Sequence, residues 1–222
     1  AIAKKLLKAM KIKTFGFVQQ IGNIKCEKIN INYIEKNSLR IADKDKFDEM
    51  ANLIDSVRKS GDSIGGVIEV RSTGMPAGLG SPVFEKLDAR LSSAIMGIGG
   101  VRGFEIGLGF QVASMKGSEV NDIMVGKSKG KVKFRTNNAG GILGGISNGN
   151  DLILRFALKP TSSISQKQDS IDNKGKQKKL QVKGRHDPCL CPRAVPIAEA
   201  MVNLVLLDCI LENNLSTLKK IT

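Results

Sequence analysis

The chain has 222 residues, of which 41% are hydrophobic, enough to bury the core of one large domain or two small ones. Aromatic residues make up only 4% and Trp is missing, which argues against a stacking platform for single-stranded nucleic acid. The formal net charge of +14 leaves three interpretations open: lysines spread over solvated faces, a site for an anionic small molecule, or a nucleic-acid surface, which the scattering of the lysines disfavours.

The chain opens directly in a helical pattern. Apolar residues recur at helical spacing, with lysines between them, at Ile2, Leu6, Leu7 and Met10. This predicted helix has no lead-in and no N-cap residue. We therefore expect that a segment upstream of Ala1 is missing.

Four further elements are predicted before residue 100. Residues 12–22 and 63–74 have strand character. Between them, apolar residues at helical spacing predict a helix that is capped by Asp43 and stopped by Gly61. A second amphipathic helix is predicted over residues 83–97. Its inward face is expected to hold Phe84, Leu87, Leu91, Ala94 and Ile95.

The segment from residue 97 to residue 149 is rich in glycine, most densely in "GIGGVRGFEIGLGF" and "NNAGGILGGISNGN". Glycine permits positive φ and close backbone approach, but it is costly inside regular elements. Two explanations stay open. The glycines form tight turns between short strands, or their backbone lines a flat or phosphorylated ligand.

The last third of the chain predicts a strand over residues 151–160 and a mobile polar loop or hairpin over residues 165–180. A long apolar helix follows in "PIAEAMVNLVLLDCILENN". Its inward positions are expected to be Ala198, Met201, Val202, Val205, Leu206 and Cys209. Because helices and strands alternate without the regular rhythm of a doubly wound sheet, we expect a single domain, residues 1–222, of the α+β class.

The four cysteines indicate a reducing compartment. The opening "AIAKKLLKAM" has no signal-peptide core, and no run approaches the roughly 18 apolar residues of a membrane span. We therefore expect a cytoplasmic protein with free thiols.

Several common site motifs fail on their spacing. The "GKS" of residues 126–128 lacks the glycine five places earlier that a phosphate loop needs, and "GIGGVRG" has its last glycine one place late for a dinucleotide fold. Cys189 and Cys191 are one residue apart, which does not fit a structural zinc site, so we expect no metal. Ser/His/Asp hydrolysis is disfavoured because His186 adjoins Asp187 in the chain and no G-x-S-x-G elbow occurs.

Two segments remain as candidates for a site. "KPTSS" (159–163) ends a predicted strand with a cation, hydroxyls and backbone N–H groups, which suits a phosphate monoester. "GRHDPC" (184–189) places a cation, an imidazole and a carboxylate on a loop stiffened by Pro188. Taken alone, they predict a generic anion site.

These segments also carry a resemblance to a known family. "LDARLSSAIMGIGGVRGFEIGLGF", "GSEVND", "GGILGGISNG", "KPTSS" and "KGRHDPC…PRAVPIAEAM" follow one another over essentially the whole chain. In their order and spacing these segments resemble chorismate synthase, and the combination of "GRHDPC" with "GGISNG" is highly specific for that family. The resemblance implies a β–α–β sandwich, with helices packed between two antiparallel sheets, here incomplete.

The resemblance implies a lyase of the shikimate pathway to aromatic amino acids. Such enzymes form chorismate from 5-enolpyruvylshikimate-3-phosphate by anti-1,4-elimination of phosphate, and they require reduced FMN; some reduce it with NADPH. A homotetramer is implied for the complete protein, and neither nucleic acid nor membrane is needed as a partner. Two alternatives stay open: an inactive fragment that keeps partial FMN binding or oligomerisation, and an unrelated phosphate-binding or RNA-binding module.

The resemblance further assigns roles to residues. The implied cofactor-binding residues are Gly99, Gly100, Gly144, Lys159, Pro160, Thr161, Ser162, Ser163 and Arg185. Relatives often carry an amide residue and alanine where this chain has Gly99 and Gly100, so only backbone contact is expected there. Asp187 is the implied catalytic residue, near flavin N5, where it helps a proton to be taken and released. His186 is expected to be structural, and the cysteines to be packing residues.

Three segments of the family's N-terminal third are missing here. Its two catalytic histidines lie in "ESHG"-like and "SHADYT"-like segments, and a "GRSSARE" segment binds flavin and substrate phosphate. His186 is this chain's only histidine. We therefore expect the chain to correspond to the C-terminal two thirds of the enzyme and to have little activity alone.

Overall fold

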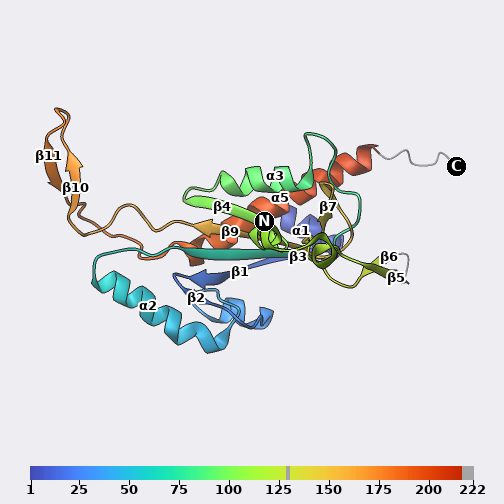
Figure 1. Cartoon of the computed structure of the whole chain (residues 1–222), viewed down its shortest axis with the longest axis horizontal. Coiled ribbons are helices and arrows are strands. Elements are labelled where there is room, and N and C mark those ends of the chain that lie inside the picture. Colours follow the sequence, from blue (N-terminus) through green and yellow to red (C-terminus); the bar gives the residue numbers. More distant parts are fainter. Residues whose placement is uncertain (129–130, 217–222) are drawn as a thin grey trace. The chain divides into compact units, whose positions relative to one another are not determined.

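The computed structural model describes residues 1–128 and 131–216. In these residues the helices are α1 (Ile2–Ala9), α2 (Phe47–Lys59), α3 (Leu87–Met96), α4 (Gly117–Val120) and α5 (Cys191–Ser216), with the 3-10 helices η1 (Ile31–Lys36), η2 (Lys44–Lys46) and η3 (Gly109–Ser114). The strands are β1 (Lys13–Ile21), β2 (Ile24–Lys25), β3 (Gly66–Thr73), β4 (Val101–Ile106), β5 (Met124–Ser128), β6 (Lys131–Phe134), β7 (Ile142–Leu143), β8 (Ile146–Ser147), β9 (Leu152–Leu158), β10 (Gln168–Ile171) and β11 (Gln177–Leu180). The α+β class is confirmed (Figure 1).

The chain divides into two compact units. Unit 1 holds Ala1–Gly16, Glu69–Phe156 and the chain from Val195 onward, and unit 2 holds Phe17–Ile68 and Ala157–Ala194. The boundaries fall inside β1, β3, β9 and α5. The single domain expected from the sequence stays a prediction.

One five-stranded sheet runs through the fold in the order β2-β1-β3-β9-β4. The alternation that predicted a strand over residues 151–160 is confirmed in β9. Its buried side chains are Leu152, Leu154, Phe156 and Leu158. Three antiparallel two-stranded ribbons, β5–β6, β7–β8 and β10–β11, accompany this sheet.

The helix predicted over residues 83–97 begins later than the periodicity indicated. α3 starts at Leu87, and its inward side chains Leu87, Leu91 and Ile95 are buried as predicted. The assignment of Phe84 to this face is wrong, because 89% of its surface is exposed. The cause is a turn in which the Ser81 N–H donates to the Glu85 carbonyl and leaves Phe84 outside the helix.

The first helix is confirmed as α1, but its apolar stripe is only partly covered in the described residues. Leu7 is fully buried, whereas Ile2, Leu6 and Met10 are 78%, 45% and 44% exposed. The period of 3.6 residues therefore predicted the element correctly. It did not predict how much of the stripe this chain itself covers.

The second predicted helix is confirmed as α2, with a modified start. Asp43 caps the short 3-10 turn η2, which leads into α2, rather than α2 itself. Its carboxylate accepts from the N–H groups of Glu27, Lys28 and Asp45 at 2.8, 2.9 and 3.1 Å. Burial raises the pKa of Asp43, but these hydrogen bonds outweigh burial and hold that pKa below its usual value.

The last helix, α5, corrects one expectation. Over Cys191–Leu215 it is long and apolar enough to cross a membrane by length and composition, whereas the sequence analysis expected no run of this length. The helix packs Ala198, Val202, Leu206 and Cys209 in the core as predicted, which is typical of the core helix of a globular domain. Met201 and Val205, also expected to point inward, are only half-buried.

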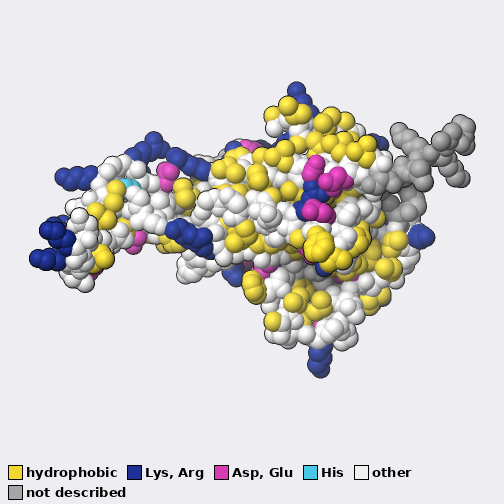
Figure 2. Space-filling view, turned by 90° about the horizontal axis from the view of Figure 1, so that it is seen from above, with side chains coloured by type: hydrophobic (Ala, Val, Ile, Leu, Met, Phe, Trp, Pro, Cys, Tyr) yellow, Lys and Arg dark blue, Asp and Glu magenta, His cyan; other side chains and the backbone are white. Residues whose placement is uncertain are grey.

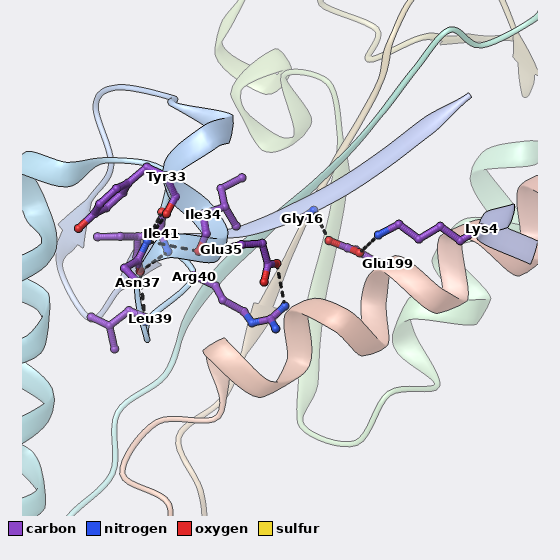
Figure 3. Close-up of polar contacts among 10 residues, drawn as sticks. All are labelled: Lys4, Gly16, Tyr33, Ile34, Glu35, Asn37, Leu39, Arg40, Ile41 and Glu199. Carbon is purple, nitrogen blue, oxygen red and sulfur yellow. Dashed lines mark hydrogen bonds and ion pairs between the residues drawn. The ribbon is translucent and has the colours of Figure 1, made fainter. Parts of the chain in front are cut away.

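Two polar networks connect residues within their own units (Figure 3). In unit 2, the Asn37 amide accepts from the Leu39 and Ile41 N–H groups at 3.2 and 3.1 Å and donates to the Tyr33 carbonyl at 2.8 Å. In unit 1, Glu199 of α5 accepts from the Gly16 N–H at 2.9 Å and from Lys4 Nζ at 2.8 Å.

The polar segment 165–180 forms the β10–β11 hairpin. Its strands pair from Gln168 opposite Leu180 to Ile171 opposite Gln177. The hairpin half of the prediction is confirmed, and its mobility stays a prediction.

Candidate functional site

The two candidate segments lie together in unit 2. β9 ends at Leu158, and Pro160 follows, which has no N–H to continue a strand ladder. The Thr161 hydroxyl donates to the Asp187 carbonyl at 3.1 Å, and Ser163 Oγ lies 2.9 Å from His186 Nδ1. "KPTSS" and "GRHDPC" are therefore joined by two side-chain contacts.

The loop before β3 holds both segments from a third side. The Ser63 hydroxyl donates to the Thr161 carbonyl at 2.6 Å. The Ile64 N–H donates to the Pro188 carbonyl at 2.8 Å. A Cβ at Gly65 would lie 2.4 Å from the Leu158 carbonyl oxygen, so only glycine allows the loop to pass this close. Sequence reasoning missed this loop because its contribution is mainly through the backbone.

Within "KPTSS", the polar groups differ in what they can offer a ligand. Lys159 Nζ donates to Ser162 Oγ at 2.6 Å, which leaves the Ser162 O–H available as a donor. Thr161 donates its O–H to the Asp187 carbonyl, so its hydroxyl helps to hold the loop, and its contact with a ligand stays a prediction. A cation beside a hydroxyl fits a phosphate monoester through charge-assisted hydrogen bonds.

In "GRHDPC", the Asp187 carboxylate is paired. Arg193 donates from Nη1 to Asp187 Oδ2 at 2.7 Å, and the Asp187 side chain is 27% exposed. Arg193 lies in the first turn of α5. Sequence reasoning missed this partner, although a cation six residues after the carboxylate, at the start of a helix, was a usable signal. Arg185 is exposed on the same loop.

The two cysteines of this region are hydrogen-bonded to each other. Cys191 is fully buried and Cys189 is half-buried. Their mutual hydrogen bond lowers the pKa of the Cys189 thiol, against the effect of burial, and raises the pKa of Cys191 together with burial. In the described part of the chain, no group of three or more metal-ligating side chains occurs.

The glycine candidates belong to unit 1. Gly144 and Gly145 are the two turn residues of the β7–β8 hairpin, with φ of 61° and 83°, which this tight turn requires. Gly99 and Gly100 form the turn after α3, with the Val101 N–H donating to the Ile98 carbonyl at 3.2 Å. Tight turns are therefore confirmed as one reason for the glycines, and backbone contact with a ligand stays a prediction.

Asp122 organises the entry to this glycine-rich loop. Its Oδ1 accepts from Thr136 Oγ1 at 2.5 Å and the Asn138 N–H at 2.7 Å, and its Oδ2 accepts from the Ala139 N–H at 3.0 Å. Burial raises the pKa of Asp122, but the bonds from Thr136, Ala139 and Asn138 outweigh it and the pKa is lowered. Sequence reasoning quoted "GSEVND" without giving this aspartate a role.

Positive charge gathers on the β10–β11 hairpin of unit 2, and Figure 2 shows a group of Lys and Arg side chains at the place that this hairpin has in Figure 1. The hairpin's basic side chains are Lys174, Lys176, Lys178 and Lys179. Asp172 and Asp169 pair with Lys178 and Lys179 and offset part of this charge. The excess of cations produces a field that attracts anions to unit 2.

Comparison with known proteins gives one consistent result. A model of the family "Chorismate synthase" matches residues 1–211. The chain is 50% identical over 220 residues to the chorismate synthase of Archaeoglobus fulgidus, covering 97% of this chain and 61% of the relative. It is 47% identical to that of Methanothermobacter thermautotrophicus, covering 94% of this chain and 57% of the relative.

A solved structure described as "Crystal Structure of Chorismate Synthase" superimposes with a TM-score of 0.79 at 32% identity, over 96% of this chain and 60% of that chain. The chain thus spans about three fifths of the length of the proteins it matches. Since the match covers nearly all of this chain, the chain belongs to the chorismate synthase family.

Proposed function

We propose that the chain forms the larger part of a cytoplasmic chorismate synthase, a lyase that eliminates phosphate from 5-enolpyruvylshikimate-3-phosphate with reduced FMN. The observation that carries this is the joining of "KPTSS" to "GRHDPC" by the contacts Thr161–Asp187 and Ser163–His186. These contacts bring "KPTSS" next to the loop that carries Asp187, which supports a phosphate site near this residue. The net charge of +14 suits two anionic ligands, the flavin phosphate and a substrate that carries a phosphate and carboxylates.

The chain's own residues would divide the binding of FMN between them. Lys159 and Ser162 would hold the phosphate end, because they combine a cation with an available O–H donor. Arg185, exposed on the neighbouring loop, would contact the flavin. In unit 1, the backbone at Gly144 stays a proposed flavin contact on the strength of the family resemblance, and a Cβ there would meet nothing within 4 Å. Gly99 and Gly100 would contribute backbone only.

Asp187 would hold the proton of the reaction. Reduced FMN supplies electron density when bound, and the protein supplies orientation and charge. Arg193 occupies Asp187 Oδ2, so we assign proton transfer to Oδ1. The same ion pair fixes the carboxylate's direction, which a general base needs. NADPH as reductant and a homotetramer of the complete protein are further parts of the proposal.

A second candidate, a fragment that binds FMN without turnover, is favoured by one observation. The chain has a single histidine, His186, and both of its ring nitrogens are engaged within the fold. It cannot supply the two histidine functions that the family uses.

A chimera tests the proposed function. Residues 1–211 would replace the matching segment of the A. fulgidus relative, and chorismate formation would be measured with reduced FMN and 5-enolpyruvylshikimate-3-phosphate. Turnover by a folded chimera supports the proposal. A chimera that folds and binds FMN without turnover contradicts an active site in this chain and leaves the second candidate.

A further inference from the structure

Both ring nitrogens of His186 have partners. Nδ1 lies 2.9 Å from Ser163 Oγ, and Nε2 lies 3.0 Å from the Val182 carbonyl oxygen. A carbonyl oxygen only accepts, so Nε2 carries the hydrogen in this arrangement. In a neutral imidazole Nδ1 is then the acceptor, and the Ser163 O–H must donate to it.

This direction matters for what Ser163 can do. A Ser163 hydroxyl that donates to His186 presents only lone pairs to a ligand at residues 159–163. Phosphate oxygens also present lone pairs, so the two would repel. A second proton on the ring reverses the bond. Nδ1–H then donates to Ser163 Oγ, and the Ser163 O–H becomes available to a phosphate.

We propose that His186 is a positioning residue that couples phosphate-monoester binding at residues 159–163 to the uptake of one proton on Nδ1. The inference rests on the proposed function, which puts the phosphate of FMN at this segment. His186 acts through Ser163 and touches no reacting atom. It therefore sets the affinity for the ligand and its dependence on pH, rather than the chemical step.

The surrounding charges determine the sign of the coupling. The charged residues on the two segments that contact the ring, on the loop that holds these segments and at the start of α5 are Asp62, Lys159, Lys183, Arg185, Asp187 and Arg193. The Asp187 carboxylate is already paired with Arg193 at 2.7 Å. A phosphate dianion at residues 159–163 would attract both a proton on Nδ1 and the neighbouring cations, so phosphate binding and proton uptake favour each other.

Nuclear magnetic resonance can follow this proton directly. The chain has one histidine, so protein purified without a histidine tag and labelled with ¹⁵N gives one pair of imidazole nitrogen resonances. At pH 7.5 we expect one protonated and one unprotonated nitrogen without ligand, and two protonated nitrogens with saturating FMN. Riboflavin, which lacks the phosphate, should leave the pair unchanged. An unprotonated Nδ1 in the FMN complex would contradict the proposal.

The pH dependence of affinity gives a second readout. With a coupled proton, the affinity for FMN should fall by as much as tenfold per pH unit between pH 7 and 8.5. Phosphate monoesters themselves titrate near pH 6, so the comparison of variants carries the test. Ser163→Ala and His186→Gln should flatten the slope while Lys159 still supports binding, and thermal melts check their folding.

The outcomes separate this inference from the proposed function. If FMN binds no better than riboflavin, the phosphate site fails and the coupling falls with it. If FMN binds better than riboflavin, but its affinity changes with pH equally in wild type, Ser163→Ala and His186→Gln, the phosphate site is supported and the proton coupling is wrong. If a variant does not fold, the imidazole nitrogen resonances of the wild-type protein still show whether Nδ1 is protonated in the FMN complex.

Discussion

Replacement of Asp122 by alanine should destabilise unit 1 through the glycine-rich loop. The carboxylate accepts three hydrogen bonds, from Thr136 Oγ1, the Asn138 N–H and the Ala139 N–H. Hydrogen bonds to a charged group contribute about 1.5–3 kcal/mol each. Asp122 is only partly buried, so water can replace some of them. We therefore expect a loss of about 2–4 kcal/mol in the free energy of unfolding at pH 7.

The stability deficit of Asp122→Ala should also depend on pH, in a direction set by the pKa of Asp122. The pKa of Asp122 is lowered from the ordinary value of 3.8, so the ionised form is favoured in the folded state. Its contribution is fully present above the unfolded pKa and is lost as pH falls through the folded pKa. The deficit of Asp122→Ala should therefore shrink below about pH 4.

Urea unfolding followed by circular dichroism, at pH 7 and at steps down to about pH 3, measures these differences. Asp151→Ala is the matched control, because Asp151 lies in the same unit with an exposed side chain; it should stay within about 0.5 kcal/mol of wild type. A deficit at Asp122 as small as that of the control, or one that does not change with pH, would refute the reasoning.

Three further predictions concern packing and activity. Gly66→Ala should lower the free energy of unfolding, measured in urea, by more than about 2 kcal/mol, because its Cβ would lie 2.1 Å from the Gln20 carbonyl oxygen and 2.9 Å from Cys191 Sγ. Gly99→Ala is the control: its Cβ would meet nothing within 4 Å, so its free energy of unfolding should stay near that of wild type. Asp187→Asn in the A. fulgidus chimera should slow single-turnover chorismate formation while FMN affinity and melting temperature stay nearly unchanged; a wild-type rate would remove Asp187 from the catalytic residues. The 222-residue chain alone should give almost no chorismate with reduced FMN, since acid–base groups contribute about 10²–10⁴-fold each and His186 is its only histidine; robust turnover would overturn this.

The regular elements could be predicted from the sequence wherever the periodicity was strong. The alternation of β9 and the helical stripes of α2, α3 and α5 indicated the right element in the right place. The start of α3 was missed because the Ser81–Glu85 turn depends on a local backbone hydrogen bond that no apolar pattern reports. The exposure of Ile2 and Leu6 was missed because periodicity shows which face of a helix is apolar, but not whether another part of the chain packs against that face.

The two segments of the candidate site could be predicted from the sequence, but the contacts that join them could not. Thr161 meets Asp187 across 26 positions of the chain, and this contact depends on where β9 and α5 place their ends. The direction of the Ser163–His186 bond also needs the Val182 carbonyl, whose role is invisible in a sequence. Arg193 and Asp122 were within quoted motifs. The spacing of Arg193 from Asp187 was a usable signal, whereas the role of Asp122 as a loop anchor appears only in three dimensions.

Calorimetric titration of the chain with FMN and with riboflavin, for wild type and Lys159→Ala, tests the central claim most directly. The claim is that "KPTSS" holds the phosphate of the flavin. The account predicts that wild type binds FMN more tightly than riboflavin and that Lys159→Ala weakens FMN about 10- to 150-fold, the equivalent of roughly 1.5–3 kcal/mol, with riboflavin unaffected. Equal affinity for the two flavins, or an unchanged FMN affinity in a folded Lys159→Ala variant, would contradict it.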